Sequence, residues 1–390
     1  MVPRQINALL RRYLDNFKAV AILGPRQCGK STLAKGILEE FPDKVYLDLE
    51  NPADRIKLNE PVLFFKSLAN HTICIDEVQL MPELFNTLRG IIDQSKRTGQ
   101  FLILGSASRD LIRQSSETLA GRIIYLELTP FLYEELNLNS DNVLQYVSKG
   151  GFPDSFLAAD EELSFVWRRS FVSAFLERDI AQLGFNYPPE TMRRLWTFIA
   201  HSQGQMVNLS EFGQLLGLSH TTIRKYIDLL AATYMLRILP PFENNVKKRL
   251  AKTPRIYIRD SGILHSLLNI RDLNTLFSHP VLGISWETMV IENVLGSIDC
   301  DKAGFYRTMN GAEIDLVIER NDIRVGIECK SSLTPSVEKG LYSCMEDLQL
   351  GEAFVVAPVS TSYFLKENIR VMPIHELLPE LRKKFNIEMK

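Results

Sequence analysis

Residues 24–31 read GPRQCGKS, and this stretch decides how the first part of the chain folds. It fits the pattern G-x-x-x-x-G-K-[ST], a loop whose backbone N–H groups wrap phosphates in front of a helix N-terminus. Gly24 and Gly29 permit backbone conformations and close approaches that a Cβ would hinder. In such a loop Lys30 would reach the β- and γ-phosphates of a nucleotide, and the Ser31 hydroxyl would bind Mg²⁺. The other interpretation is a glycine turn that only joins a strand to a helix.

The flanking sequence favours the phosphate loop. The apolar run AVAIL precedes it at 19–23, and the helical pattern STLAKGILEEF follows at 31–41. Strand, loop and helix therefore occur in the order that the motif requires. The residues predicted to surround the nucleotide phosphates are Gly24, Pro25, Arg26, Gln27, Cys28, Gly29, Lys30, Ser31 and Thr32.

A second apolar run, HTICIDE at 71–77, ends in two acids. The carboxyl end of a strand is where α/β sheets bind their ligands. Asp76 is predicted to complete the Mg²⁺ site with Ser31, and Glu77 to orient and polarise the attacking water. This assignment favours hydrolysis over transfer of phosphate to a second substrate, although a phosphotransferase would use the same loop. The alternative for the acid pair is a structural role.

Three further residues are candidates for the same reaction. The next run, QFLILGSAS at 100–108, ends in small polar residues, of which Ser106 is predicted to touch the γ-phosphate or the water. Arg122 is a candidate arginine finger that would reach into the site of a neighbouring subunit, and its alternative is a surface ion pair. Arg26, inside the loop, is predicted to contact phosphate.

Length and composition limit the class of protein. The 390 residues predict two to three domains at roughly 150 residues per domain. With 45% hydrophobic and 24% charged residues, the chain is typical of globular proteins. A net charge of −2 excludes a uniformly basic surface but not a local basic patch. The five cysteines lack CxxC spacing, which argues against a disulfide framework or a zinc site. A charged N-terminus and the lack of a long apolar run favour a soluble cytoplasmic protein without a membrane segment.

The pattern along the chain changes several times. Apolar runs alternate with helical patterns up to residue 130, which predicts a parallel sheet covered by helices. Residues 131–186 are mainly helical, and Pro188-Pro189 interrupts the chain before a further helical stretch. Short strands return after 255 and indicate a second α/β unit. Four domains are predicted: a nucleotide-binding sheet at residues 1–135, a helical connector at 136–189, a winged-helix unit at 190–255 and a second α/β domain at 256–390.

Several motifs together resemble a known family. GPRQCGKSTL, ICIDEVQ, ILGSAS and LAGRIIYLELTPF look like the prokaryotic AAA-type ATPases that carry a C-terminal domain of unknown function, and FLERDIAQL, SGILHSLL, GISWETMVIENVL, GAEIDLVIE and IECKSS continue the resemblance over nearly the whole chain. The resemblance implies ATP binding, hydrolysis and a C-terminal fold like that of the PD-(D/E)xK restriction nucleases. Cys28 departs from it, because this loop position is often a small aliphatic residue.

Residues 209–235 are predicted to form a helix-turn-helix. Ser210 and Ser219 are the expected N-caps, and Phe212, Leu215 and Leu216 are expected to face the second helix. Between 190 and 260 there are 11 Lys or Arg against 5 Asp or Glu, a local excess of six positive charges. Such an excess suits contact with a DNA backbone, whereas the alternative is a unit used for domain packing. The residues predicted to contact DNA are Thr221, Arg224 and Lys225 of the second helix, and Lys247, Lys248 and Arg249 of a wing.

The C-terminal part contains a carboxylate pattern. GAEIDLVIE and RVGIECKSS are predicted to be paired strands, and the period of two places Glu328 and Lys330 on one face. Asp315 and Glu328 would then hold Mg²⁺ for phosphodiester cleavage, and Lys330 would stabilise the hydroxide or the developing charge on the phosphate. In the helix GISWETMVIENVLGSI, Glu287 lies on the apolar face and is expected to join this site, whereas Glu292 is expected to point away. The alternative is that Glu287 simply pairs with Lys330.

Two functions follow from these patterns. The first is a Mg²⁺-dependent ATPase that moves a winged-helix and nuclease-like half acting on DNA. The second is a nucleotide-dependent binding or signalling module for DNA or a protein partner, in which the C-terminal half has no activity of its own. If Arg122 acts between subunits, the protein forms a homo-oligomer.

Overall fold

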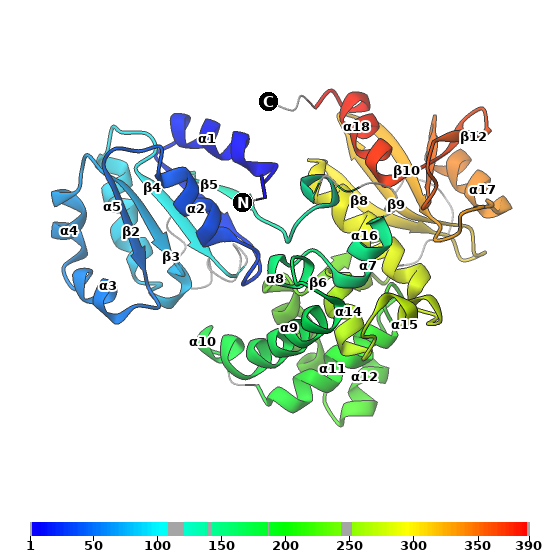
Figure 1. The fold of residues 1–390 in the computed structure, drawn as a ribbon, viewed down its shortest axis with the longest axis horizontal. Coiled ribbons are helices and arrows are strands. Elements are labelled where there is room, and N and C mark those ends of the chain that lie inside the picture. The colour runs from blue at the N-terminus through cyan, green and yellow to red at the C-terminus, as the bar shows by residue number, and fades with distance from the viewer. Residues whose placement is uncertain are drawn as a thin grey trace.

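The chain folds into an N-terminal sheet domain beside a larger body made of helices and a second sheet (Figure 1). The computed structural model describes residues 2–107, 121–136, 138, 142–185, 187–242 and 252–387. The N-terminal domain contains strands β1 (Ala19–Leu23), β2 (Lys44–Asp48), β3 (Thr72–Asp76), β4 (Phe101–Gly105) and β5 (Ile123–Glu127). Its helices are α1 (Ile6–Asn16), α2 (Lys30–Leu38), α3 (Pro52–Lys57), α4 (Pro61–Ser67), the 3₁₀ turn η1 (Val78–Leu80) and α5 (Leu84–Gln94).

The five strands are all parallel and lie in the order β2-β3-β4-β1-β5. Side chains alternate between the two faces, as the period of a strand requires. Val20 and Ile22 pack with α1 and α2, whereas Ala19, Ala21 and Leu23 pack on the other face with α4 and α5. The predicted parallel sheet with helices on both faces is therefore confirmed.

Strand β5 was not among the predicted strands. Its residues flank β1 on the side away from β4, with Ala19 opposite Ile123. The strand has a mixed pattern of burial because it forms the edge of the sheet. It matters for the site because the residue after it, Leu128, lies against the loop that follows β1.

The helical middle of the chain is confirmed. Its elements are η2 (Tyr133–Leu136), α7 (Val143–Lys149), α8 (Pro153–Phe156), α9 (Glu161–Ala174), the π-helical turn η4 (Phe175–Asp179) and α10 (Ile180–Gln182). They continue with α11 (Pro189–His201), α12 (Leu209–Leu216), α13 (His220–Ala232), α14 (Ser261–Leu267) and α15 (Leu273–Phe277). The Pro188-Pro189 break falls at the start of α11, where proline fits the first helical turn.

Helices α12 and α13 occupy the predicted helix pair, and strands β6 (Leu236–Leu239) and β7 (Arg255–Ile258) follow as an antiparallel pair. Ser219 caps α13 as predicted, by accepting a hydrogen bond from the Thr222 amide. The cap of α12 is Asn208 rather than Ser210, because the helix begins two residues earlier than predicted. Leu215 was predicted to face α13 but is 59% exposed.

The second sheet lies at the C-terminal end and has the order β12-β13-β11-β10-β9-β8. The predicted pairing of the two carboxylate-bearing strands is confirmed, because β9 and β10 are antiparallel with Leu316 opposite Ile327. The strands are β8 (Lys302–Arg307), β9 (Glu313–Arg320), β10 (Ile323–Cys329), β11 (Ala353–Val356), β12 (Tyr363–Lys366) and β13 (Ile369–Met372). The helices of this part are α16 (Leu282–Ser297), α17 (Lys339–Leu348) and α18 (Ile374–Lys384).

The middle helices and the C-terminal sheet share one apolar core. Trp196 of α11, Met289 of α16 and Phe354 of β11 belong to a single cluster of buried side chains, whereas the N-terminal sheet has clusters of its own. Helix α16 is buried on most sides between these elements. Glu292 was predicted to point away from the apolar side, but it is buried and paired with Arg237 and Arg259.

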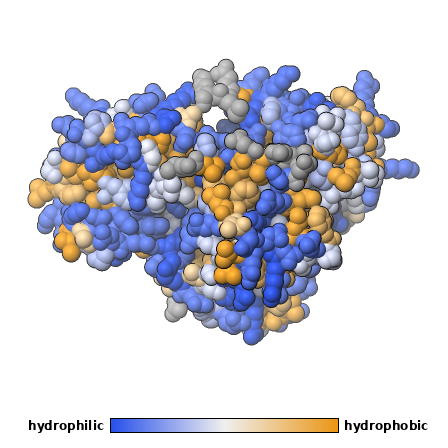
Figure 2. Space-filling view, viewed as in Figure 1, coloured by the Kyte–Doolittle hydropathy of each residue, from blue (hydrophilic) through white to orange (hydrophobic). Residues whose placement is uncertain are grey.

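The surface shows the same division. In Figure 2 hydrophilic residues cover most of the N-terminal sheet domain on this face, and hydrophobic residues gather near the middle of the molecule. The exposed apolar side chains of the adjoining helices include Leu157, Leu163 and Val166. Within the described ranges, no helix combines the length and the apolar character that crossing a bilayer requires.

His265 joins three helices inside the shared core. Its Nδ1 lies 3.0 Å from the Ser148 carbonyl oxygen and its Nε2 lies 2.8 Å from Ser285 Oγ. Burial lowers the pKa of His265 from an ordinary 6.5 to about 3. The folded protein therefore keeps this ring neutral, whereas the unfolded chain protonates it below pH 6.5.

We expect the contribution of His265 to stability to be complete above pH 6.5 and to be lost as the pH falls toward 3. The loss should approach about 1.4 kcal/mol per pH unit. His265→Gln should be less stable than the wild type at pH 7.5, and the difference should shrink on acidification. Chemical denaturation from pH 7.5 to 4.5 measures it, with His201→Gln, at the exposed end of α11, as the control. A difference that does not change with pH would contradict this.

Candidate functional site

The loop after β1 has the conformation that its glycines predict. A Cβ on Gly24 would lie 2.1 Å from the Leu128 carbonyl oxygen, so no other residue fits there without moving the backbone. Gly29 has φ +99°, which lies in the left-handed region that glycine favours. Helix α2 begins at Lys30, whose Nζ donates to the carbonyl oxygens of Gly24 at 3.0 Å and Pro25 at 2.8 Å. The loop therefore closes around the buried lysine in front of a helix N-terminus.

The acid after β3 meets the helix after this loop. Ser31 Oγ donates to Asp76 Oδ2 at 2.6 Å, so the two residues predicted to share Mg²⁺ are in contact. Tyr46 of β2 also donates its hydroxyl to Asp76 Oδ2, and this residue was not predicted. Burial and the hydrogen bond to Asp76 raise the pKa of Tyr46 well above its ordinary range, so the phenol stays a donor.

The second acid is held by two neighbours. Ser106 Oγ donates to Glu77 Oε2 at 3.1 Å and accepts from the Gln79 side-chain amide at 2.8 Å. Gln79 also donates to Glu77 Oε2 and accepts from the Ser106 backbone amide at 3.3 Å. Ser106 therefore lies beside Glu77, and its predicted contact with the γ-phosphate or the water stays a prediction, whereas Gln79 was missed. Its only signal in the sequence is its place two residues after the acid.

Arg26 contacts carboxylates in this structure. It pairs with Glu50 after β2 and with Asp179 in η4, and its Nε lies 4.0 Å from Glu77 Oε1. Its Nη1 also donates to Gln182 Oε1 at 2.9 Å. The guanidinium therefore joins the phosphate loop to the helical middle of the chain, which sequence reasoning did not anticipate.

The remaining residues of the predicted nucleotide site differ in position. Cys28 packs its side chain into the core beside the Leu128 carbonyl oxygen, so only its backbone belongs to the loop. Gln27 and Thr32 are exposed. Arg122 pairs with Asp93 of α5 and directly precedes β5, at the amino-terminal edge of the parallel sheet. Within one chain it lies at the edge opposite the loop, and its action in a neighbouring subunit stays a prediction.

The nucleotide site has the donors that Mg²⁺ prefers. The hydroxyl oxygen of Ser31 and the carboxylate of Asp76 are hard oxygen ligands at the carboxyl edge of the sheet. Asp76 is 4% exposed and already accepts from Ser31, Tyr46 and the Glu77 amide, so its orientation is fixed before any ligand binds. These residues fit the ion.

The C-terminal carboxylates come together, but an arginine lies among them. Arg255 of β7 pairs with Glu313 and has its Nη1 3.7 Å from both Glu287 Oε1 and Asp315 Oδ1. Glu287 also accepts from the Tyr257 hydroxyl at 2.6 Å. The alternative pairing of Glu287 with Lys330 is therefore not found. Instead Lys330 Nζ lies 2.8 Å from Glu328 Oε1, which places these two on one face as predicted.

Burial is the main influence on the acids of this cluster. Together with the Asp315 charge, it raises the pKa of Glu328 to about 7 and that of Glu287 well above its ordinary range. Burial also raises the pKa of Asp315. Among the residues that the structure describes, no three His, Cys, Asp or Glu side chains are grouped to hold a metal ion. Arg255 lies among these acids and supplies a counter-charge, and the second metal site stays a prediction.

Three arginines of the positively charged stretch between 190 and 260 form ion pairs inside the protein. Arg237, Arg255 and Arg259 pair with acids of α16, β9 and the N-terminal domain. Of the residues predicted to contact DNA, Thr221, Arg224 and Lys225 are exposed on α13, and Arg224 pairs with Asp228. Lys247, Lys248 and Arg249 lie outside the described residues. Part of the charge excess is therefore neutralised by acids within the described part of the chain.

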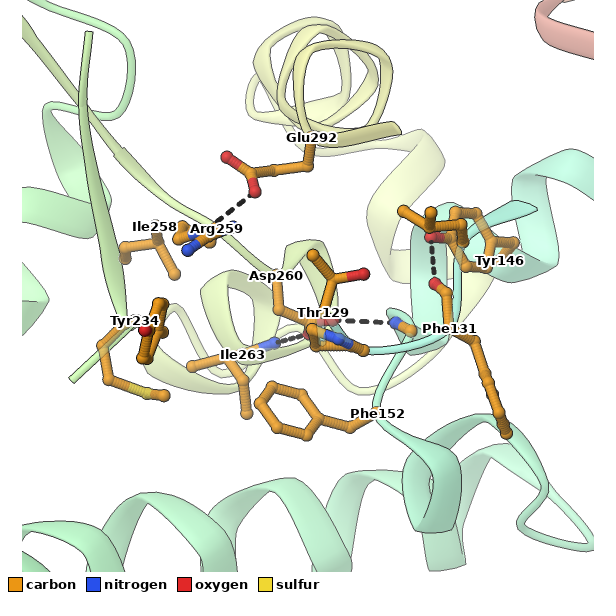
Figure 3. A pocket seen from close by; sticks show the side chains of 14 residues that line it. Thr129, Phe131, Tyr146, Phe152, Tyr234, Ile258, Arg259, Asp260, Ile263 and Glu292 are labelled. Atoms are coloured by element: carbon orange, nitrogen blue, oxygen red, sulfur yellow. Dashed lines mark hydrogen bonds and ion pairs between the residues drawn. The ribbon is translucent and has the colours of Figure 1, made fainter. Parts of the chain in front are cut away.

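A small cavity marks the junction between the two bodies (Figure 3). It has a volume of about 40 Å³ and lies where the chain leaves β5 at Thr129 to Phe131. Arg259 donates to Glu292 of α16 at 2.8 Å and to Glu127 of β5 at 2.6 Å. The Tyr146 hydroxyl donates to the Phe131 carbonyl oxygen at 2.7 Å. Polar contacts therefore fix the exit of the chain from the sheet domain.

Family models match three parts of the chain. Residues 16–137 match one described as an AAA domain. Residues 140–274 and 282–377 match two domains of unknown function, DUF8612 and DUF4143. Among solved structures, a Walker-type ATPase of Pyrococcus abyssi is similar, with a TM-score of 0.50 and 14% identity, over 69% of this chain and 96% of that one. This likeness concerns the fold alone.

Two relatives are similar in sequence. An uncharacterized protein of Haemophilus influenzae is 25% identical over 218 residues, which are 51% of this chain and 53% of that protein. An uncharacterized protein of Mycobacterium tuberculosis is 38% identical over 375 residues, which are 96% of this chain and 84% of that protein. The chain therefore belongs to the same family as the mycobacterial protein, and it is an AAA-type ATP-binding protein whose N-terminal domain has the fold of P-loop ATPases.

Proposed function

We propose that the protein is a Mg²⁺-dependent ATPase that hydrolyses ATP at the loop of residues 24–31. The observation that carries this proposal is the contact of Ser31 with Asp76 at 2.6 Å, beside a second acid, Glu77. Mg²⁺ bound by Ser31 and Asp76 would neutralise phosphate charge. The loop amides and Lys30 would bind the phosphates, since this geometry suits anions.

Glu77 is the proposed base. A water held by its carboxylate would attack the γ-phosphorus while the bond from phosphorus to the β–γ bridging oxygen breaks, and the products are ADP and phosphate. The water proton would pass to Glu77. Ser106 and Gln79 orient the carboxylate, because both hydrogen-bond to Oε2 and leave Oε1 available. A residue held in this way suits hydrolysis, whereas a phosphotransferase needs room for a second substrate.

For the C-terminal half we propose binding rather than catalysis. Arg255 contacts Glu313 and lies near Glu287 and Asp315, where a nuclease would hold its metal. A cavity of about 760 Å³ borders this cluster, between α11, β7 and α16. These observations favour a nucleotide-dependent binding or signalling module over a nuclease of the PD-(D/E)xK type.

DNA remains a candidate partner of the helix pair. Thr221, Arg224 and Lys225 lie on the exposed side of α13, and the segment of Lys247, Lys248 and Arg249 follows β6. A winged-helix unit would use this side for phosphate contacts. A protein partner at the same surface is the alternative, because the described basic side chains around it are mostly paired with acids.

We expect Lys30→Ala to lower ATP turnover by at least about 100-fold, because it removes the buried positive charge facing the phosphates. Glu77→Gln should keep ATP affinity within about twofold and lower kcat by 10²-fold or more, as loss of a general base does. Phosphate release without an added acceptor measures both. Lys44→Ala, at the opposite end of the sheet, is the control. Full turnover in a folded Lys30→Ala protein would refute the site.

We expect the wild-type protein not to nick supercoiled plasmid DNA with Mg²⁺ or Mn²⁺, with or without ATP. Asp315→Asn and Glu328→Gln are the matched variants, because each removes one charge of the cluster with little change in shape. Nicking by the wild type that disappears in both variants would show that the cluster is catalytic after all. Nicking that persists in both would point to a contaminating nuclease.

Replacing Arg255 should destabilise the protein strongly. Arg255 has 6% of its side chain exposed, and Arg255→Gln removes the positive charge next to Glu287 and Asp315, whereas Glu313 keeps its contact with Arg307. The expected loss in free energy of unfolding is roughly 3–5 kcal/mol at pH 7.5, as for other broken buried pairs. The loss should be smaller at pH 5.5, because burial raises the pKa of Glu287 and of Asp315, so these two acids bind protons more readily there. Arg307→Gln also loses a contact to Glu313 but is 41% exposed, so it should change stability little. Urea denaturation of the wild type and both variants at the two pH values measures these differences in free energy of unfolding.

A further inference from the structure

Arg26 connects the phosphate loop to the helical middle of the chain. From the sheet domain it meets Glu50, and from the middle it meets Asp179 and Gln182. Its side chain is only 12% exposed and that of Asp179 only 5%. The contact is therefore a largely buried ion pair between two domains, one partner of which belongs to the proposed ATP site.

Asp179 lies in an unusual part of the backbone. It ends the π-helical turn η4, a type of irregularity that is frequent at functional sites. The same turn contains Phe175, whose ring packs against Trp196 with a distance of 5.4 Å between ring centroids. Trp196 is fully buried in the core shared with the C-terminal half. A shift of η4 would thus change the surroundings of this tryptophan.

The catalytic side of the ATP site adjoins this turn. One small cavity is lined by Arg26, Gln79 and Ser106 from the sheet domain and by Phe175 and Asp179 from η4. Gln79 and Ser106 are the residues that hold the proposed base, Glu77. The carboxylate of Asp179 therefore lies within the electrostatic surroundings of the reacting phosphates.

We propose that Asp179 is a positioning residue of the ATP site, which binds Arg26 in competition with the phosphates of the nucleotide. The inference rests on the proposed ATPase function. Phosphates held by the loop amides lie next to Arg26, and a guanidinium binds phosphate and carboxylate oxygens in the same bidentate way. Asp179 therefore weakens nucleotide binding, and the bound nucleotide weakens the hold of Arg26 on Asp179.

This competition would couple nucleotide binding to the position of turn η4. When Arg26 turns to phosphate, Asp179 keeps Arg178, whose Nε lies 3.1 Å from Oδ1 and whose side chain is mostly exposed. Without Arg26, the Asp179 carboxylate is more stable near solvent, paired with Arg178, than inside the buried junction. Turn η4 then shifts, and Phe175 carries the shift to Trp196. Binding of ATP is in this way transmitted to the body that contains the C-terminal half.

The first experiment measures nucleotide affinity. Asp179→Asn should bind a fluorescent ATP analogue with Mg²⁺ about tenfold more tightly, which is within the usual range of coupling between sites. In turnover, KM should fall by a similar factor while kcat stays within about twofold. Glu177→Gln is the matched control, because it removes the same charge from the same turn but its side chain is 65% exposed and points to Arg193. It should leave affinity unchanged.

The second experiment follows Trp196. In a Trp167→Phe, Trp286→Phe background it is the sole tryptophan, since the chain has three. In the protein with Arg26 in place, ATP should change the fluorescence emission of Trp196. In Arg26→Gln, saturating ATP should change this emission much less. Adding Asp179→Asn to Arg26→Gln should no longer tighten binding, because the competing guanidinium is gone.

The possible results distinguish failure of the proposed ATPase function from failure of the proposed role of Asp179. If the wild type binds no ATP at all, the proposed function fails. If it binds ATP, but Asp179→Asn and Glu177→Gln have the same affinity as the wild type, the role of Asp179 is refuted. Should Asp179→Asn not fold, the Trp196 signal in Arg26→Gln decides, and a response as large as in the wild-type loop would overturn the proposal.

Discussion

The parallel pairing of β1, β3 and β4 is the constraint on which the proposed site depends. Parallel strands end at the same edge of a sheet, so the segments that follow these three strands meet there. This brings Ser31 to Asp76 and Ser106 to Glu77, although 45 and 29 residues separate the partners in sequence. The same constraint keeps Arg122 away, because the residue before a parallel strand lies at the other edge. One topological feature thus decides which candidates can act together in one chain.

Buried arginines hold the junctions between the parts of the molecule. Arg26 and Arg259 each contact acids from more than one domain, and Arg255 of β7 contacts acids of α16 and β9. A guanidinium suits this position because it offers five donors in a plane and stays charged when buried. A local excess of positive charge in the sequence is therefore ambiguous. It predicts a nucleic-acid surface only if the side chains are exposed, and here Arg237, Arg255 and Arg259 turn inward.

The sequence predicted the features that are local or periodic. The loop of residues 24–31, the acids Asp76 and Glu77, the parallel sheet and the pairing of β9 with β10 follow from short motifs and from the period of two. Tyr46, Gln79 and Arg255 could not be found in this way, since their roles depend on register between distant segments. Tyr46 lies opposite Cys74, which places it on the same face as Asp76 two residues later. That relation exists only once the strand order is known.

The distribution of apolar and polar contacts indicates where the molecule can move. The middle helices and the C-terminal sheet share one core of interlocked side chains, which resists sliding because any shift opens cavities. The N-terminal sheet meets this body largely through polar groups, with Arg4 on Glu135, Arg259 on Glu127 and Arg26 on Asp179. Polar partners can be exchanged for a ligand or for water at little net cost, whereas buried methyl groups cannot. Of these contacts, that of Arg26 is the one made by the phosphate loop itself. A nucleotide would therefore act on this junction first, and the body beyond it would respond as a unit.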